Sequence, residues 1–117
     1  MHRLKQLNVY RKALILTKEI RTVTKSFPKD ELFVLTSQFK RAGDSIALNI
    51  AEGAGNASPK EFIRFLTYSI RSGFECLGCL DIAIENAFIS ESVHEETSFR
   101  VNEVIAMLYG LQKRLSQ

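Results

Sequence analysis

Apolar residues recur at intervals of three and four along almost the whole chain, which is the spacing of one face of an α-helix. The strict alternation of apolar and polar residues that is typical of a half-buried strand does not occur. The pattern predicts four helices, over about residues 8–26, 30–53, 59–88 and 92–115. The residues expected to face the core are Val9, Ala13, Leu16, Ile20, Val23 and Phe27; Leu32, Leu35, Phe39, Ala42, Ile46 and Ile50; Phe62, Phe65, Ser69, Gly73, Cys76, Leu80, Ala83 and Ala87; and Val93, Val101, Val104, Leu108, Leu111 and Leu115.

Two of the expected helix starts carry capping signals. Ser58 precedes Pro59 and stands three residues before Glu61, so its hydroxyl can accept from the Glu61 backbone N–H while the Glu61 carboxylate reaches back. Ser92 and Glu95 offer a second capping box of the same kind. These signals place the starts of the third and fourth helices.

The links between the predicted helices are about 4–6 residues long. Pro28 would cost a helix interior about 3 kcal/mol and therefore marks the first link. Glycines in residues 53–56 are expected to close the second helix in the left-handed conformation. Such short links predict an all-α fold, an antiparallel up-down-up-down four-helix bundle.

Composition is that of an ordinary soluble domain, and it predicts one domain over residues 1–117. The chain has 117 residues, of which 45% are apolar and 25% charged. No apolar run approaches the roughly 18 residues of a membrane span, and the first 20 residues are too cationic for a signal peptide. A cytoplasmic protein without membrane association is therefore expected.

The positive charge is concentrated at the start of the chain. Residues 1–29 hold eight cations and one anion, a net charge of +7, whereas residues 30–117 have a net charge of −4. Arg11, Lys18 and Lys25 are spaced by seven, with Arg21 on the same side of the helix, along about 20 Å of its axis. Such a row can follow a phosphate backbone, which makes RNA or DNA a candidate partner; the alternative is a solvated charged face.

More apolar surface is present than one bundle core requires. A second row lies beside the core row of the third helix: Ile63, Ile70, Phe74, Leu77 and Phe88. Leu14 and Ile15 flank the cations of the first helix, and Val34 and Leu48 share a polar face of the second. Exposed apolar patches usually mark protein contacts, so a homo-oligomer formed through the second and third helices is predicted. The alternative is a core that widens on these helices.

No set of residues suited to catalysis or metal binding is found. Cys76 and Cys79 form a C-x-x-C motif, but they fall mid-helix without a second pair, so two small buried residues are expected. His94 is expected in a solvated first turn, and neither it nor His2 follows an arginine at the spacing that some helical nucleases use. No enzyme activity, catalytic residue, metal or cofactor is predicted.

Three motifs carry a family resemblance. They are Glu-Leu-x-x-Leu-Thr-x-Gln over residues 31–38, Arg-Ala-x-x-Ser-Ile-x-x-Asn-Ile-Ala-Glu-Gly over residues 41–53 and Lys-Glu-Phe-x-x-Phe-Leu over residues 60–66. With them the chain resembles the four helix bundle protein family, also called the 23S rRNA-intervening-sequence protein family. Two departures occur: Asn56 replaces a basic residue, and Arg71-Ser72 replaces Gly-Ser, although Glu75 keeps its place.

The resemblance implies a small bacterial bundle, encoded in some species within insertions of large-subunit ribosomal RNA genes. It also implies relatives that form ring-shaped homopentamers and have no attached enzymatic activity. One branch, the accessory variability determinant of diversity-generating retroelements, binds nucleic acid and a reverse transcriptase. A homopentamer that binds nucleic acid is therefore expected, the alternative being an adaptor for a protein such as an RNA-processing enzyme or reverse transcriptase.

The motif of the second helix supplies one further prediction. Arg41, Ser45, Asn49 and Glu52 fall on one face, so they are expected to form a polar network that fixes the register between subunits. A ligand-binding groove on the same face is the alternative.

Overall fold

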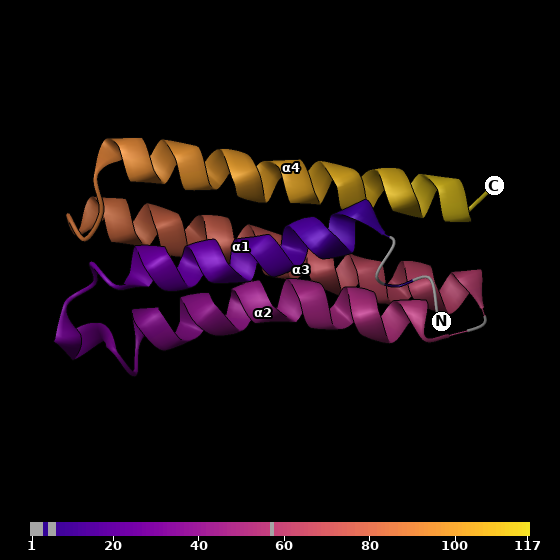
Figure 1. Ribbon diagram of the computed structural model, residues 1–117, viewed down its shortest axis with the longest axis horizontal. Helices are drawn as coiled ribbons and strands as arrows, with labels where there is room; N and C mark the ends of the chain where they lie inside the picture. The colour runs from indigo at the N-terminus through magenta and orange to yellow at the C-terminus, as the bar shows by residue number, and fades with distance from the viewer. Residues whose placement is uncertain (1–3, 5–6, 57) are drawn as a thin grey trace.

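The computed structural model describes residues 4, 7–56 and 58–117. The helices are α1 (Asn8–Thr24), α2 (Leu35–Ala54), α3 (Pro59–Glu85) and α4 (Glu91–Leu115), with one 3₁₀ turn, η2 (Lys29–Glu31). Within these described parts no strand forms. The α1–α2 and α3–α4 connections lie at one end of the molecule, and the α2–α3 connection lies at the other (Figure 1). The fold is thus the predicted antiparallel up-down-up-down four-helix bundle.

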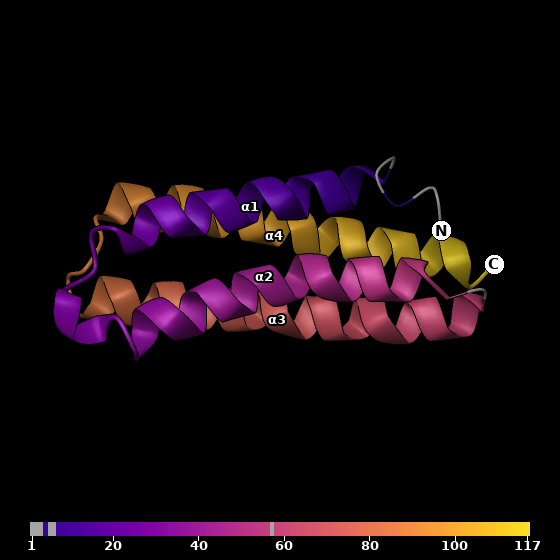
Figure 2. The same cartoon turned by 60° about the horizontal axis from the view of Figure 1, so that its bottom comes forward.

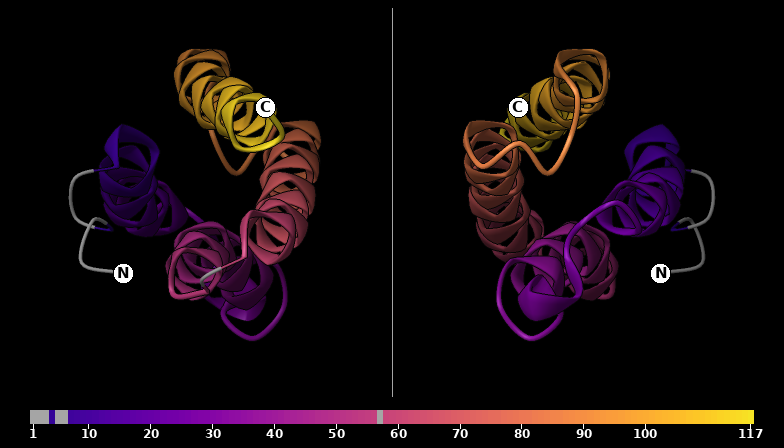
Figure 3. Two further views of the ribbon diagram at one scale, coloured as in Figure 1. Left: turned by 90° about the vertical axis from the view of Figure 1, so that its right-hand side faces the viewer. Right: turned by 90° about the vertical axis from the view of Figure 1, so that its left-hand side faces the viewer.

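The helices follow one another around the bundle, each packed on the next (Figures 2 and 3). The α2–α3 pair makes the most extensive contact and the α1–α4 pair the least. The core is built mainly from the predicted rows, and Leu66, which no predicted row contains, also belongs to it. Its larger side chains with less than 2% exposure include Ile20, Phe39, Ile46, Ile50, Leu66, Leu80, Val101 and Leu108. Val23, Phe62 and Leu115 pack at its margin. Burial of these apolar surfaces is the main source of stability.

The predicted start of the second helix at residue 30 is wrong. After Pro28 the chain makes the 3₁₀ turn and a further turn, and α2 begins only at Leu35. A carboxylate oxygen of Glu31 accepts from the Leu35 backbone N–H at 3.4 Å, so Glu31 occupies the free end of α2 rather than its interior. Leu32, expected in the core, is consequently 50% exposed.

The α3–α4 connection also differs from the prediction. Helix α3 ends at Glu85, and Ala87 adopts the left-handed conformation with φ of 60°. The Phe88 N–H donates to the Ala83 carbonyl at 2.8 Å, the long-range bond of a Schellman motif, and Ala87 is exposed. Ser90 rather than Ser92 caps α4, because its hydroxyl accepts from the Val93 N–H at 3.1 Å, and Val93 is partly exposed.

The end of α2 is closed without a left-handed glycine. Gly55 has φ of −75°, and among the described residues no glycine has a positive φ. Gly53 instead allows close helix packing, since a Cβ there would lie 2.8 Å from both Phe62 Cδ1 and Phe65 Cβ. The Ser58 cap on the Glu61 N–H is confirmed at 3.4 Å, whereas the Glu61 carboxylate pairs with the neighbouring Arg64.

Over the part of the chain that the structure describes, no helix is both long and apolar enough to cross a membrane.

Candidate functional site

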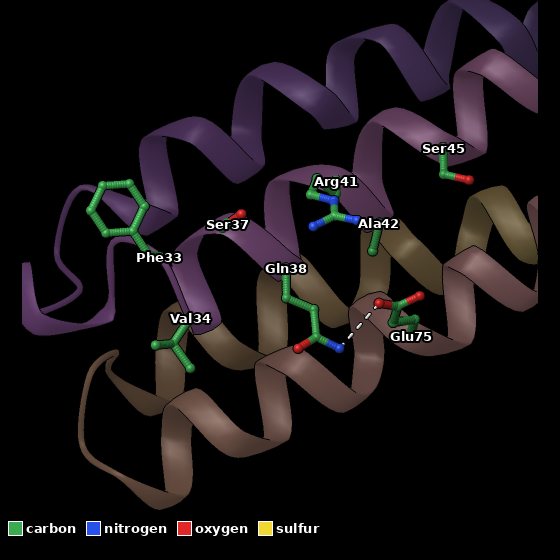
Figure 4. A pocket seen from close by; sticks show the side chains of 8 residues that line it. All are labelled: Phe33, Val34, Ser37, Gln38, Arg41, Ala42, Ser45 and Glu75. Carbon is green, nitrogen blue, oxygen red and sulfur yellow. Dashed lines mark hydrogen bonds between the residues drawn. The ribbon is translucent and has the colours of Figure 1, made fainter.

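The predicted motif residues of α2 line its contact with α3, where a row of polar groups joins the two helices. Ser45 lies at its centre: the Ser72 hydroxyl donates to the Ser45 hydroxyl at 2.9 Å. The Asn49 side-chain amide donates to the carbonyl and the hydroxyl of Ser45 at 2.9 and 3.0 Å. About two turns nearer the start of α2, the Gln38 amide donates to a Glu75 carboxylate oxygen at 3.2 Å (Figure 4). The Ser72–Ser45 and Gln38–Glu75 bonds cross between the helices and help to fix the register of α2 on α3.

A shallow groove of about 580 Å³ opens beside this row. Its lining residues are Phe33, Val34, Ser37, Gln38, Arg41, Ala42, Ser45 and Glu75 (Figure 4). Arg41 is exposed, and its guanidinium makes no hydrogen bond or ion pair with any residue that the structure describes. Phe33, at the mouth of the groove, is 88% exposed. The groove therefore offers a cation and an apolar edge to an incoming group.

The four-residue network predicted from the motif forms only in part within one chain. Ser45 and Asn49 are bonded to each other, but the Glu52 carboxylate, like Arg41, makes no side-chain bond inside the described region. Arg41 and Glu52 are eleven residues, or about three helical turns, apart on α2. Two opposite charges thus stand exposed on one helix face, each without a partner in the described chain.

Ser72 and Glu75 are the site residues that sequence reasoning missed. They lie three residues apart on α3, the spacing that puts two side chains on one helix face, and they meet Ser45 and Gln38. Ser72 follows the residue that departs from the family's Gly-Ser, and Glu75 matches the family pattern. The sequence alone does not identify them as site residues, because which α2 residues they meet depends on the α2–α3 register.

The predicted apolar surplus is smaller on α3 than expected. Ile70 is only 5% exposed and belongs to the core, whereas Phe74 is 53% exposed. Ile63, Leu77 and Phe88 are partly buried. On α2 the prediction holds better, because Val34 is 60% and Leu48 65% exposed.

The predicted cations of α1 are all on the molecular surface. Arg11, Lys18 and Lys25 are exposed and form no ion pair with the residues described. Arg21 differs, because its guanidinium donates to both oxygens of Asp44 at 2.8 and 2.9 Å, and these bonds raise the pKa of Arg21. Three cations of the predicted row therefore remain available, and the fourth is shared with a carboxylate.

Ion pairs join α1 to α4 on its other side. Lys12 pairs with Glu103 at 3.1 Å, and Arg100 pairs with Glu19 at 2.8 Å. Partial burial raises the pKa of Glu19, an effect that Arg100 opposes and Glu96 reinforces. Lys12 and Arg100 therefore form ion pairs between α1 and α4 within the bundle.

The cysteines and the described histidine have structural surroundings. Cys76 and Cys79 are 0% and 3% exposed, and burial raises both thiol pKa values, that of Cys79 to about 11. His94 lies 2.9 Å from an Asp81 carboxylate oxygen, which links α4 to α3. No cluster of three or more potential metal ligands occurs within residues 4, 7–56 and 58–117, and His2 falls outside that part.

The fold and the α2–α3 row define a class, that of small antiparallel helical bundles whose second and third helices are joined by a polar seam. The family model of the 23S rRNA-intervening sequence protein matches residues 5–110, and the chain belongs to this family.

Known structures agree with this assignment. A crystal structure of a protein of unknown function from the S23 ribosomal protein family of Bacteroides thetaiotaomicron is 25% identical in sequence. The similarity covers 90% of this chain and 95% of that one, with a TM-score of 0.83. Comparison with curated proteins gives no match.

Proposed function

We propose that this protein is a non-enzymatic, cytoplasmic bacterial bundle that forms a homo-oligomer and binds RNA or DNA through α1. The observation that carries the proposal is the row of Arg11, Lys18 and Lys25, which are exposed and unpaired among the described residues. Other cations of the bundle, such as Lys12 and Arg100, are held by carboxylates. A row left open on one helix is available to phosphates.

Three phosphate contacts per subunit give a modest affinity by themselves. Each contact releases about one counterion, so the logarithm of the binding constant is expected to fall with a slope of roughly 3 per subunit against the logarithm of salt concentration. Several copies of α1 in one assembly would bind one nucleic acid together and raise the affinity without any new contact. The oligomer is thus part of the proposed function.

The α2–α3 face supports self-association. Arg41 and Glu52 are exposed opposite charges without a described partner, and a second copy of the chain could pair with both, while Leu48 lies between them on the same helix. The family resemblance favours a homopentamer. Ring assembly would leave α1 free to bind nucleic acid if the α2–α3 face forms the subunit contacts.

The test is binding of a fluorescent RNA and a DNA of the same sequence, measured by anisotropy at about 50 and 200 mM salt. The variant R11E/K18E should weaken binding at least about tenfold, because two cations of the row become anions. The matched control K60E/K113E makes the same charge change on exposed residues of α3 and α4, and should have a much smaller effect. Equal losses of affinity in R11E/K18E and K60E/K113E would show that binding depends only on the net charge of the protein, and would contradict the proposed binding surface on α1.

A second candidate is an adaptor whose partner is a protein, such as an RNA-processing enzyme or a reverse transcriptase. The groove beside Arg41 favours it, because Phe33 and Val34 are exposed next to an unpaired guanidinium. Failure of RNA and DNA to bind at about 50 mM salt, where phosphate contacts are strong, would favour this candidate.

A further inference from the structure

Residues around the α1–α2 connection line a second hollow of about 580 Å³. Figure 1 shows this connection at one end of the bundle. It is formed by the end of α1, the 3₁₀ turn and the first two turns of α2. The lining residues are Arg21, Thr24, Lys25, Phe27, Pro28, Lys29, Leu32, Thr36 and Lys40. Of these, Lys29 and Lys40 have no part in the family motifs or in the predicted cationic row, whereas Leu32 and Thr36 belong to the first motif.

Four cations surround this hollow, and few anions oppose them. Arg21, Lys25, Lys29 and Lys40 all line it, and Asp44 neutralises only Arg21. Glu31 is close in sequence, but it does not line the hollow and its carboxylate is bonded to the Leu35 N–H. Three cations that no described carboxylate neutralises therefore line a space of small-ligand size.

The Thr36 hydroxyl adds a hydrogen-bonding group to the hollow. Thr36 lines the hollow and is only 6% exposed, yet its hydroxyl makes no hydrogen bond with a described residue. Thr24, on the opposite wall, already donates to the Arg21 carbonyl at 3.1 Å. Thr36 is also the second residue of α2, but the Glu31 carboxylate already caps this helix end through the Leu35 N–H, so the cations and the hydroxyl are the groups left to hold an anion. No fully buried side-chain polar atom of the described residues lacks a partner, so the Thr36 hydroxyl is accessible from the hollow and can bond a ligand atom there.

The rest of the lining is apolar. It comes from Phe27, Pro28 and Leu32, of which Phe27 is 8% and Leu32 50% exposed. Such a surface suits the sugar or base that accompanies a phosphate, and it would be unusual for a site that takes a bare inorganic anion.

We infer that this hollow binds a phosphomonoester, either the terminal phosphate of a nucleic-acid chain or a free mononucleotide. The identity of the ligand rests on the proposed function, whereas the charge and the hydroxyl do not. A terminal phosphate carries nearly two negative charges at neutral pH, compared with one on each internal phosphodiester. Converging cations with a hydroxyl donor therefore favour the chain end over the backbone that the α1 row follows.

The experiment compares 5′-phosphorylated and 5′-hydroxyl oligonucleotides of one sequence, together with adenosine 5′-monophosphate, on the full-length protein. The phosphorylated oligonucleotide should bind about tenfold more tightly, as expected for additional charge-assisted hydrogen bonds. The substitution T36V keeps the shape and the charge and removes only the hydroxyl, so it should reduce this preference severalfold. K29Q/K40Q should abolish it, whereas R11E/K18E should weaken both oligonucleotides and leave their ratio unchanged.

The thermal stability of these variants serves as the control for correct folding. Because the Thr36 hydroxyl bonds to no described residue, T36V should unfold at the same temperature as the natural protein or slightly higher. Equal binding of both oligonucleotides, or a preference that survives in K29Q/K40Q, would overturn the phosphomonoester site and leave the α1 proposal standing. Binding of the mononucleotide without any oligonucleotide would uphold the site and overturn the nucleic-acid function instead.

Discussion

The Arg21 guanidinium and the Asp44 carboxylate form two parallel hydrogen bonds, of 2.8 and 2.9 Å, between α1 and α2. This geometry is the strongest form of an Arg–carboxylate contact, because it fixes both groups in one plane. It orients the cationic face of α1 relative to α2 and holds Arg21 at the edge of the hollow lined by Thr36. The pair therefore connects the stability of the bundle to the arrangement of its cations.

A double-mutant cycle with R21Q and D44N should give a coupling energy of roughly 0.5–1 kcal/mol. Both side chains are substantially exposed, so solvent screens the pair and the value stays near that of a good surface ion pair. Urea unfolding at low salt measures the cycle, and about 1 M salt should reduce the coupling. Additive effects of the two substitutions would show that the pair contributes nothing to the fold.

Two glycines provide a matched test of helix packing. G53A should destabilise the bundle by about 1–2 kcal/mol, because its new methyl group would lie 2.8 Å from Phe62 Cδ1 and from Phe65 Cβ. G78A has no atom within 4 Å of the added Cβ, so it should stabilise α3 by about 0.5–1 kcal/mol through helix propensity. Thermal unfolding of both variants checks the pair, and stabilisation by G53A would be incompatible with this packing.

The two thiols should react slowly while the protein is folded. Burial raises the pKa of Cys79 to about 11 and that of Cys76 further still, so few thiolates exist at pH 8. Labelling of the folded protein with a thiol reagent should be slow, because it requires local opening around each thiol, and should become rapid in denaturant. The expected order in the folded protein is Cys79 before Cys76, which mass spectrometry of the labelled peptides can establish. Rapid labelling of the folded chain would contradict the burial of this pair.

Glu19 should make a small, pH-dependent contribution to stability. Burial raises its pKa in the folded state, so folding favours the protonated carboxyl. The folded-state pKa exceeds the unfolded one, and the contribution is therefore present below the unfolded pKa and lost as pH rises through the folded pKa. Urea unfolding of E19Q and the natural protein from pH 4 to pH 7 should show the variant gaining relative stability as pH rises. A gain in the opposite direction would mean that the Arg100 ion pair outweighs burial.

The helical period determined most of the fold, because a 3-and-4 spacing of apolar residues leaves few alternatives in a chain with short links. The misplaced boundaries are where local bonds override that period. Helix α2 begins at Leu35 rather than near residue 30, and the Glu31 carboxylate caps its first N–H group. Helix α3 ends at Glu85 rather than near residue 88, because Ala87 adopts the left-handed conformation that is usually expected of glycine. The sequence placed the α2 motif on one face, but the partners of Ser45 and Gln38 depend on the α2–α3 register. The hollow at Thr36 is formed by the non-helical segment after Pro28. The helical spacing of apolar residues gives no information about the path of such a segment, so the hollow could not be predicted from it.

The assembly surface is tested by two substitutions of exposed leucines. L48E should convert the oligomer to a 13.3 kDa monomer, because it places an anion at the centre of the proposed α2 contact, beside Glu52. L14E makes the same change on α1 at a residue that is 44% exposed, and it should leave the oligomer intact. R41A should also weaken assembly, since it leaves a facing carboxylate unpaired between subunits. Sedimentation velocity at micromolar concentration distinguishes these outcomes. A natural protein that sediments only as the monomer would refute self-association, and an intact R41A oligomer that no longer binds its ligand would assign the groove to recognition.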